Sequence, residues 1–144
     1  MKKFAFPLEQ VMKYREHVQS QAELDLGRAM AKEREIQVQL DEVAAQHVSM
    51  TNYMRGVTDF KEITSAHNFF SLLDQQKEYL LGEMAKAKLV SEQKRKVLQE
   101  AMQKTESLHK LRERKFDEYK EAENHEAFDI ADDMTNARAG RIIR

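Results

Sequence analysis

The sequence predicts an all-α fold, an elongated antiparallel two-helix coiled-coil hairpin with a C-terminal helical overhang. The 144 residues include only four glycines and one proline, too few for the frequent turns of a sheet-rich domain. Hydrophobic residues make up 41% of the chain and charged residues 34%, which suits neither a thick core nor a disordered tail. Apolar residues recur at spacings of three and four, as in a coiled coil. We expect residues 1–144 to form a single coiled-coil domain.

The first helix is predicted over about residues 7–56. Pro7 suits the first turn of a helix, where its missing N–H needs no partner, and Gly56 suits the position just after the last turn. Two consecutive spacings of four at Val18, Ala22 and Leu26 predict a local shift in the seam. The apolar ladder of this helix comprises Leu8, Val11, Arg15, Val18, Ala22, Leu26, Ala29, Glu33, Ile36, Leu40, Val43, His47, Met50, Met54 and Val57.

The pattern lapses over about residues 57–67, which predicts a bent connector containing a short helical turn. Thr58 and Asp59 can cap a new helix, and Asp59 followed by Glu62 resembles a capping box. The second helix is predicted over about residues 68–137, followed by a frayed tail over 138–144. Its ladder, less regular than the first, comprises Phe69, Leu73, Gln76, Leu80, Met84, Ala87, Val90, Lys94, Val97, Ala101, Lys104, Leu108, Leu111 and Lys115, and then drifts to Tyr119 and Ala122.

A short connector makes the two helices antiparallel. We expect facing residues to have numbers that sum to about 124, which places Leu40 near Met84 and Leu8 near Phe116. Beyond about Lys120 the second helix then has no internal partner. Phe128, Ala131 and Met134 share one face of this overhang. Such a stripe predicts either docking into a groove of another protein or self-association into a dimer.

The chemistry of an enzyme is missing from the sequence. Without cysteine the chain has neither disulfides nor thiolate catalysis, its glycines form no phosphate-binding loop, and its five histidines lack metal-site spacing. We predict no catalytic residues, no cofactor and no metal. A net charge of -1 argues against nucleic acid as a partner. No run of about 20 apolar residues and no secretion leader is present, which predicts a cytoplasmic protein.

Polar residues at seam positions have a structural interpretation. Glu33 and His47 fall on the ladder of the first helix, where we expect them to fix the register or to reach past the seam to solvent.

Two apolar clusters leave more than one interpretation open. Phe4 and Phe6 precede the first helix, where they pack either as a staple onto Met12 or on the second helix near Tyr119. The second cluster is too dense to face one partner helix, so part of it should be exposed, either as a partner site or packed under the connector. It comprises Phe69, Phe70, Leu72 and Leu73.

Three segments resemble the FliJ family of the bacterial flagellar type III export apparatus. The first is the opening Phe4-x-Phe6-x-Leu8-x-x-Val11-Met12-x-Tyr14-Arg15. The second is the basic run Leu108-His109-Lys110-Leu111-Arg112-Glu113-Arg114-Lys115. The third is Glu126-Ala127-Phe128-Asp129-Ile130-Ala131, in which Phe128 and Ile130 depart from the residues that the family has there.

The resemblance implies a non-enzymatic stalk whose terminal end enters the hexameric flagellar export ATPase and promotes its activity. It also implies contacts with the cytoplasmic domain of the export gate and with late-substrate export chaperones, at the inner face of the cell membrane, through partners only. By position, the ATPase-binding residues would be Phe4, Phe6, Arg15, Arg112, Arg114, Phe128 and Met134. The gate-binding residues would be Phe69, Leu73, Gln76 and Leu80.

Two other functions remain open from the sequence. The first is a dimeric coiled-coil tether or cytoskeletal spacer, with the apolar stretch of the overhang as its dimer seam. The second is a chaperone that holds unfolded export substrates between methionine-lined helices.

Overall fold

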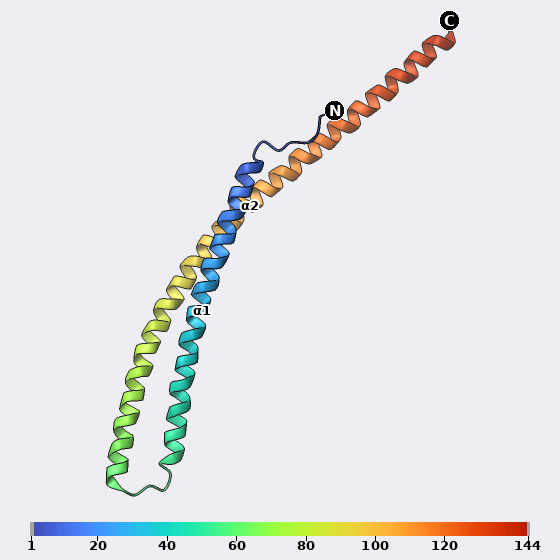
Figure 1. The fold of residues 1–144 in the computed structure, drawn as a ribbon. Helices are drawn as coiled ribbons and strands as arrows, with labels where there is room; N and C mark the ends of the chain where they lie inside the picture. The colour runs from blue at the N-terminus through green and yellow to red at the C-terminus, as the bar shows by residue number, and fades with distance from the viewer. Residues whose placement is uncertain (1, 144) are drawn as a thin grey trace. The chain divides into compact units, whose positions relative to one another are not determined.

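The computed structural model describes residues 2–143, without the side chains of residues 142 and 143. Two helices account for nearly all of them, α1 over Glu9–Tyr53 and α2 over Phe60–Ile143, and no strand occurs in this range (Figure 1). The predicted all-α two-helix hairpin is therefore confirmed. The chain divides into two compact units. We call Met1–Gln19 with Ala101–Arg144 the terminal unit and Ser20–Glu100 the turn unit.

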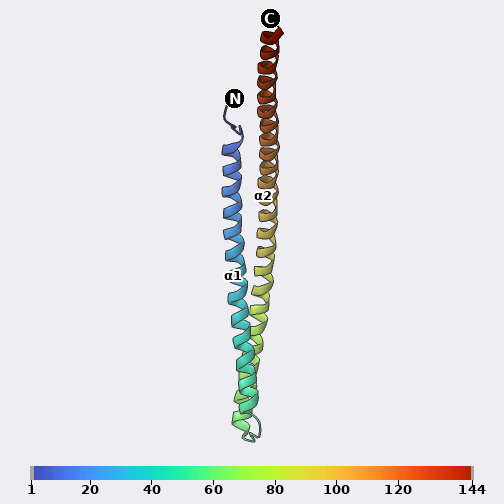
Figure 2. The same ribbon diagram turned by 90° about the vertical axis from the view of Figure 1, so that its right-hand side faces the viewer.

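In the turn unit, a short connector joins the two helices (Figures 1 and 2). Gly56 follows the last turn of α1 with a φ of 78°, a left-handed conformation that a residue with a Cβ rarely adopts. Asp59 then caps α2, because its carboxylate accepts a hydrogen bond of 3.0 Å from the N–H of Lys61. The roles predicted for Gly56 and Asp59 are thus confirmed.

The predicted helix bounds need correction. The α1 helix begins at Glu9 and ends at Tyr53, slightly inside the predicted 7–56, and α2 begins at Phe60 and not at residue 68. Most of the predicted connector over 57–67 is therefore the first part of α2, because the Asp59 cap starts the helix at once. Residues 138–143 continue α2, so the predicted tail is helical up to there, and Arg144 lies outside the described residues. That the chain forms one domain stays a prediction.

The seam of α1 is more regular than predicted. Met12 is buried whereas Val11 is exposed, and Gln19 is half-buried beside Val18. A ladder through Met12, Arg15, Gln19 and Ala22 alternates spacings of three and four without interruption. No local shift at Val18, Ala22 and Leu26 is needed, and that prediction is wrong.

The seam of α2 also follows a strict heptad, through residues that the sequence analysis did not choose. Ser91 and Thr105 are buried and Leu98 is half-buried, whereas Val90 and Val97 are exposed. Val90 and Val97 therefore lie one position outside the seam. Ala66 is buried as well, so the ladder already begins in the segment predicted to be a connector.

The core of the turn unit is small and apolar. Ile36, Met84 and Ala87 form a buried cluster, and Leu40 and Leu80 pack against it. The predicted proximity of Leu40 and Met84 agrees with this cluster. Burial of these side chains supplies the non-directional stabilisation expected of a coiled coil.

Two polar seam residues lie at the same part of the turn unit. Ser91 is 2% exposed, and its hydroxyl has no hydrogen-bond partner among the residues that the structure describes. Ser91 lines a groove on this unit together with Glu33, which is half-buried. His47, the other polar residue of the predicted seam, is exposed and lies 4.7 Å from the ring of Phe70.

The register of the two helices agrees with the predicted one in the terminal unit and differs from it near the connector. The predicted sum of about 124 would place residue 120 opposite Phe4 and residue 108 opposite Glu16, and Phe4 contacts Tyr119 while Glu16 contacts His109. Near the connector His47 contacts Phe70, earlier in α2 than predicted. The reversal at residues 54–59 lies earlier in the chain than the predicted centre near residue 62, so facing residues in this part of α2 shift in the same direction. Leu8 and Phe116, predicted to be neighbours, are each 38% exposed.

Candidate functional site

The N-terminal strap, residues 2–8, lies along α2 in the terminal unit (Figure 1). The hydroxyl of Tyr119 donates a hydrogen bond of 2.7 Å to the carbonyl oxygen of Lys2. The ring of Phe4 meets Phe116 edge-on, with centroids 5.2 Å apart, and lies 5.6 Å from Tyr119. Phe6 is buried. Of the two predicted positions for this aromatic pair, packing near Tyr119 is therefore the one observed for Phe4.

Tyr119 is held as a hydrogen-bond donor. Partial burial, together with the carboxylates of Glu123 and Glu126, raises the pKa of Tyr119 above its ordinary value of 10.0. The raised pKa extends to more alkaline pH the range in which the phenol is protonated and can donate to the carbonyl of Lys2.

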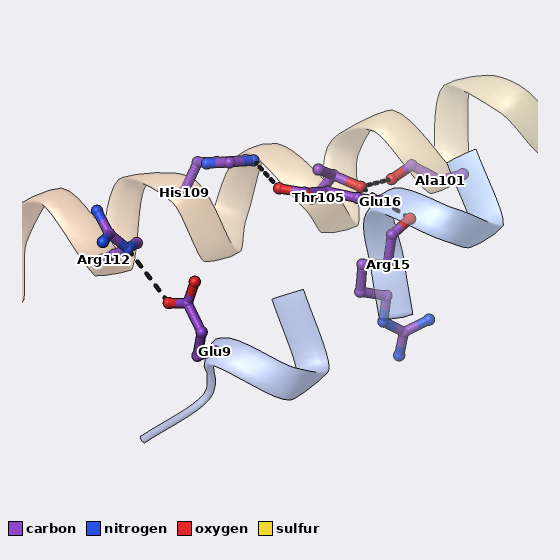
Figure 3. Close-up of polar contacts among 7 residues, drawn as sticks. All are labelled: Glu9, Arg15, Glu16, Ala101, Thr105, His109 and Arg112. Carbon is purple, nitrogen blue, oxygen red and sulfur yellow. Dashed lines mark hydrogen bonds and ion pairs between the residues drawn. The ribbon is translucent and has the colours of Figure 1, made fainter. Parts of the chain in front are cut away.

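Two polar side-chain contacts, one of them an ion pair, join α1 to α2 beside the strap (Figure 3). Arg112 Nε lies 3.3 Å from Glu9 Oε2, and the same guanidinium lies 5.5 Å from the centre of the Phe4 ring. His109 Nε2 lies 3.0 Å from Glu16 Oε1. Because each side chain is partly exposed, these pairs contribute modestly to stability and more to the choice of register.

Thr105 is the buried polar contact of the terminal unit (Figure 3). Its hydroxyl lies 2.9 Å from the carbonyl oxygen of Ala101 in its own helix and 3.3 Å from that of Arg15 in α1. One hydroxyl proton is thus shared between two carbonyl acceptors, one on each helix. The sequence analysis missed Thr105 because it assigned Lys104 to the seam; an uninterrupted heptad would have pointed to Thr105.

The seven candidate ATPase-binding residues all belong to the terminal unit but differ in accessibility. Phe6 is buried, so it acts inside the chain. Phe4, Arg15 and Arg112 are half-buried, and Phe4 and Arg112 lie in one cluster with Phe116 and Tyr119. The exposed candidates are Arg114, Phe128 and Met134.

The C-terminal part of α2 carries the most accessible of these residues. Every residue from Asn124 to Arg141 is exposed, and Figures 1 and 2 show this stretch continuing beyond the strap without a neighbouring helix. Phe128 is 71% exposed and Met134 65%. The predicted helical overhang is present, and its apolar side chains are unburied.

The four candidate gate-binding residues belong to the turn unit and are not equivalent. Leu73 is only 2% exposed and is a core residue, so its side chain is not available to a partner. Phe69 and Leu80 are half-buried, and Gln76 is exposed. Gln76 and Leu80 line a shallow groove together with Tyr79, an exposed residue that the sequence analysis did not select.

The dense apolar cluster at the start of α2 is divided between the core and the surface. Leu73 is buried, Phe69 and Phe70 are half-buried, and Leu72 is 51% exposed. The prediction that these residues cannot all face one partner helix is confirmed. Phe69 also lines a groove with Met50 and Met54 near the connector.

Residues 2–143 offer little for other kinds of site. Within that range no three histidine, cysteine, aspartate or glutamate side chains are grouped to hold a metal ion. None of the helical stretches in the same range is long and apolar enough to cross a membrane.

Comparison with known proteins identifies a family for this chain. No curated protein and no solved structure matches it. The model of the family described as flagellar FliJ protein matches residues 3–138, which include the strap except Lys2, the polar contacts between α1 and α2, and most of the exposed C-terminal stretch. The chain therefore belongs to the flagellar FliJ protein family, a component of the flagellar export apparatus.

Proposed function

We propose that this protein is the non-catalytic central stalk of the hexameric flagellar export ATPase, and that it promotes the activity of that ring. The observation that carries the proposal is the exposed stretch from Asn124 to Arg141, which presents Phe128 and Met134 to solvent in the terminal unit. An apolar helical stripe without an internal partner is typical of a helix that docks into another protein.

The dimensions and the family support the same role. Two packed helices are about 20 Å across, a width suited to the central opening of a six-membered protein ring. The strap and the ion pair of Arg112 hold the base of the exposed stretch against α1. A helix fixed at its base can transmit a push from its free part, whereas a loosely held one cannot.

The stalk acts through contacts that differ between the nucleotide states of the ring. A contact of equal strength in every state would leave the balance between those states unchanged. Phe128, Met134 and Arg114 are the exposed candidates for these contacts, while Phe4, Phe6 and Arg112 position the helix that bears them.

Deletion of residues 120–144 tests the stalk. Stimulation of ATP hydrolysis by the cognate hexameric ATPase should be lost, because the contacting stretch is absent while the seam up to Tyr119 is retained. Phe128→Ala with Met134→Ala should reduce stimulation strongly. The matched control is Val38→Ala with Val48→Ala, two exposed apolar residues of the turn unit. Stimulation that survives the deletion unchanged would contradict the proposal.

The turn unit is the proposed link to the export gate. Gln76 and Leu80 line a groove with Tyr79, so this face of α2 offers an amide, an aliphatic and an aromatic group to the cytoplasmic domain of the gate. Phe69 extends the same candidate surface, and Leu73 supports it from the core. Late-substrate export chaperones are the third proposed class of partner, in keeping with a location at the inner face of the membrane.

Variants that alter one surface at a time test the proposed link to the export gate. Gln76→Ala with Tyr79→Ala should weaken binding to the purified gate domain in a pull-down while stimulation of the ATPase stays normal. Phe128→Ala with Met134→Ala should do the reverse. If both double variants impaired both activities equally, two separate surfaces would be the wrong description.

A further inference from the structure

The exposed stretch of α2 has an apolar stripe of its own. Ala127, Ile130, Met134 and Ala137 follow one another at spacings of three, four and three, which places them on one face of the helix. Ile130 is 55% exposed and Met134 65%. In the residues that the structure describes, no other part of the chain covers this face.

Charges are arranged unevenly around the stripe. Glu123 and Glu126 lie at its N-terminal end, and Arg138 and Arg141 lie at its C-terminal end. Glu123 and Arg141 extend the same three-and-four spacing, so they occupy the face of the stripe, and Glu126 and Arg138 flank it. One end of the stripe is therefore acidic and the other basic.

This arrangement is complementary to itself. We propose that the stretch from Lys120 to Arg141 pairs antiparallel with the same stretch of a second copy of the chain, forming a two-fold symmetric coiled coil. In this pairing Ile130 faces the partner's Met134, and Ala127 faces the partner's Ala137. Glu123 then meets the partner's Arg141 at each end of the seam.

Charge selects this direction of pairing. The antiparallel arrangement has one charge contact at each end of the seam, and both join Glu123 of one copy to Arg141 of the other. A parallel arrangement would place Glu123 beside the partner's Glu123 and Arg141 beside the partner's Arg141, which is unfavourable in a coiled-coil seam. Glu123 already contacts Tyr119 within the chain, and its carboxylate still has acceptor capacity for an arginine.

This pairing does not depend on the proposed stalk function. It uses the same exposed face, so a paired copy and a copy inserted in the ATPase ring are alternatives. The dimer keeps the apolar stripe out of water when no ring is present. The dimer must dissociate before one of its copies can enter the ring.

Charge exchange tests the pairing in solution. Analytical ultracentrifugation of the full chain over a concentration series should show its mass rising from 16.9 kDa towards twice that value. E123R/E126R and R138E/R141E should each stay monomeric, since each variant carries one sign at both ends. An equimolar mixture of the two variants should form the dimer again, because every contact is then between opposite signs.

A matched control separates these contacts from net charge. E121R/D132R changes the net charge as much as E123R/E126R does, but both positions lie away from the stripe on the helix, so it should dimerise like the wild type. Circular dichroism confirms that each variant is helical. A monomeric wild type at all concentrations, variants that dimerise alone, or a mixture that stays monomeric would each overturn the pairing.

Cross-linking gives a second measurement that fixes the direction. The chain has no cysteine, so introduced thiols report only on their own positions. A mixture of Ala127→Cys and Ala137→Cys chains should form a disulfide, whereas each variant alone should not, because copies of one position lie about 15 Å apart along the paired helices and a disulfide needs Cα atoms within about 7 Å. Rapid cross-linking of Ala127→Cys alone would contradict the antiparallel direction.

Discussion

The turn unit and the terminal unit use the same two helices but hold them together differently. In the turn unit the helices pack through Ile36, Met84 and Ala87, whose burial is favourable in any orientation. In the terminal unit the contacts include Thr105 and the ion pair of Arg112 with Glu9, which require particular atoms to meet. Apolar burial therefore supplies most of the stability, while directional contacts choose which residues face each other.

The largest expected effect comes from the core of the turn unit. Leu73→Ala should lower the free energy of unfolding by about 2–5 kcal/mol, because it removes a fully buried side chain and leaves a cavity. Leu72→Ala is the matched control, since the neighbouring leucine is 51% exposed. Its effect should stay near 0.5 kcal/mol, about the size usual for surface changes. Urea unfolding followed by circular dichroism measures both, and equal losses would show that Leu73 is not a core residue.

A smaller effect is expected from the buried hydroxyl of the terminal unit. Thr105→Val keeps the shape of the side chain but removes the donor shared between the carbonyls of Ala101 and Arg15, which should cost about 1 kcal/mol. Thr64→Val is the control, because Thr64 makes the same bond within its helix, to the carbonyl of Phe60, at an exposed position. Urea unfolding measures both variants. If Thr105→Val and Thr64→Val lowered the free energy of unfolding equally, the hydrogen bond from Thr105 to the carbonyl of Arg15 in α1 would contribute nothing to stability.

The smallest effect concerns the strap and depends on pH. Because the folded chain raises the pKa of Tyr119, the protonated phenol stabilises the folded state. This contribution is fully present below the ordinary pKa of 10.0 and is lost as pH rises through the raised value. A spin label on Lys3→Cys should therefore become more mobile in that alkaline range.

Two tyrosine variants complete the pH experiment. Tyr119→Phe should abolish the pH step, since it removes the hydroxyl that donates to the carbonyl of Lys2. Tyr79→Phe should leave the step intact, because Tyr79 is exposed in the turn unit. A step that persists in Tyr119→Phe would assign the strap's pH response to another group.

The sequence predicted the hairpin, its turn residues and the exposed C-terminal stretch, because these follow from spacing and from the positions of Gly56 and Asp59. It did not predict which of two adjacent residues in α2 lies in the seam. Val90 and Val97 are more apolar than Ser91, yet Ser91 is buried and the valines are exposed, since an unbroken heptad allows only one of two adjacent positions to face α1. Preference for the larger of two neighbours explains the error at Ser91 and Thr105, but not at Val97, whose larger neighbour Leu98 is the half-buried one.

The candidate sites were predicted less completely, because accessibility depends on contacts that the sequence does not show. Phe6 and Leu73 are buried, so their predicted roles can only be indirect. The strap illustrates the reason: Phe4 contacts Phe116 and Tyr119, which lie more than one hundred residues further along the chain, and these contacts leave it half-buried.

The bond from Thr105 ends on the backbone carbonyl of Arg15, not on its guanidinium. Any amino acid at position 15 offers the same carbonyl, so this contact imposes no preference on which residue evolves there. Replacement of the Arg15 side chain therefore leaves this hydrogen bond in place. The directional contact at this layer of the seam is thus fixed by Thr105 alone, whichever side chain stands at position 15.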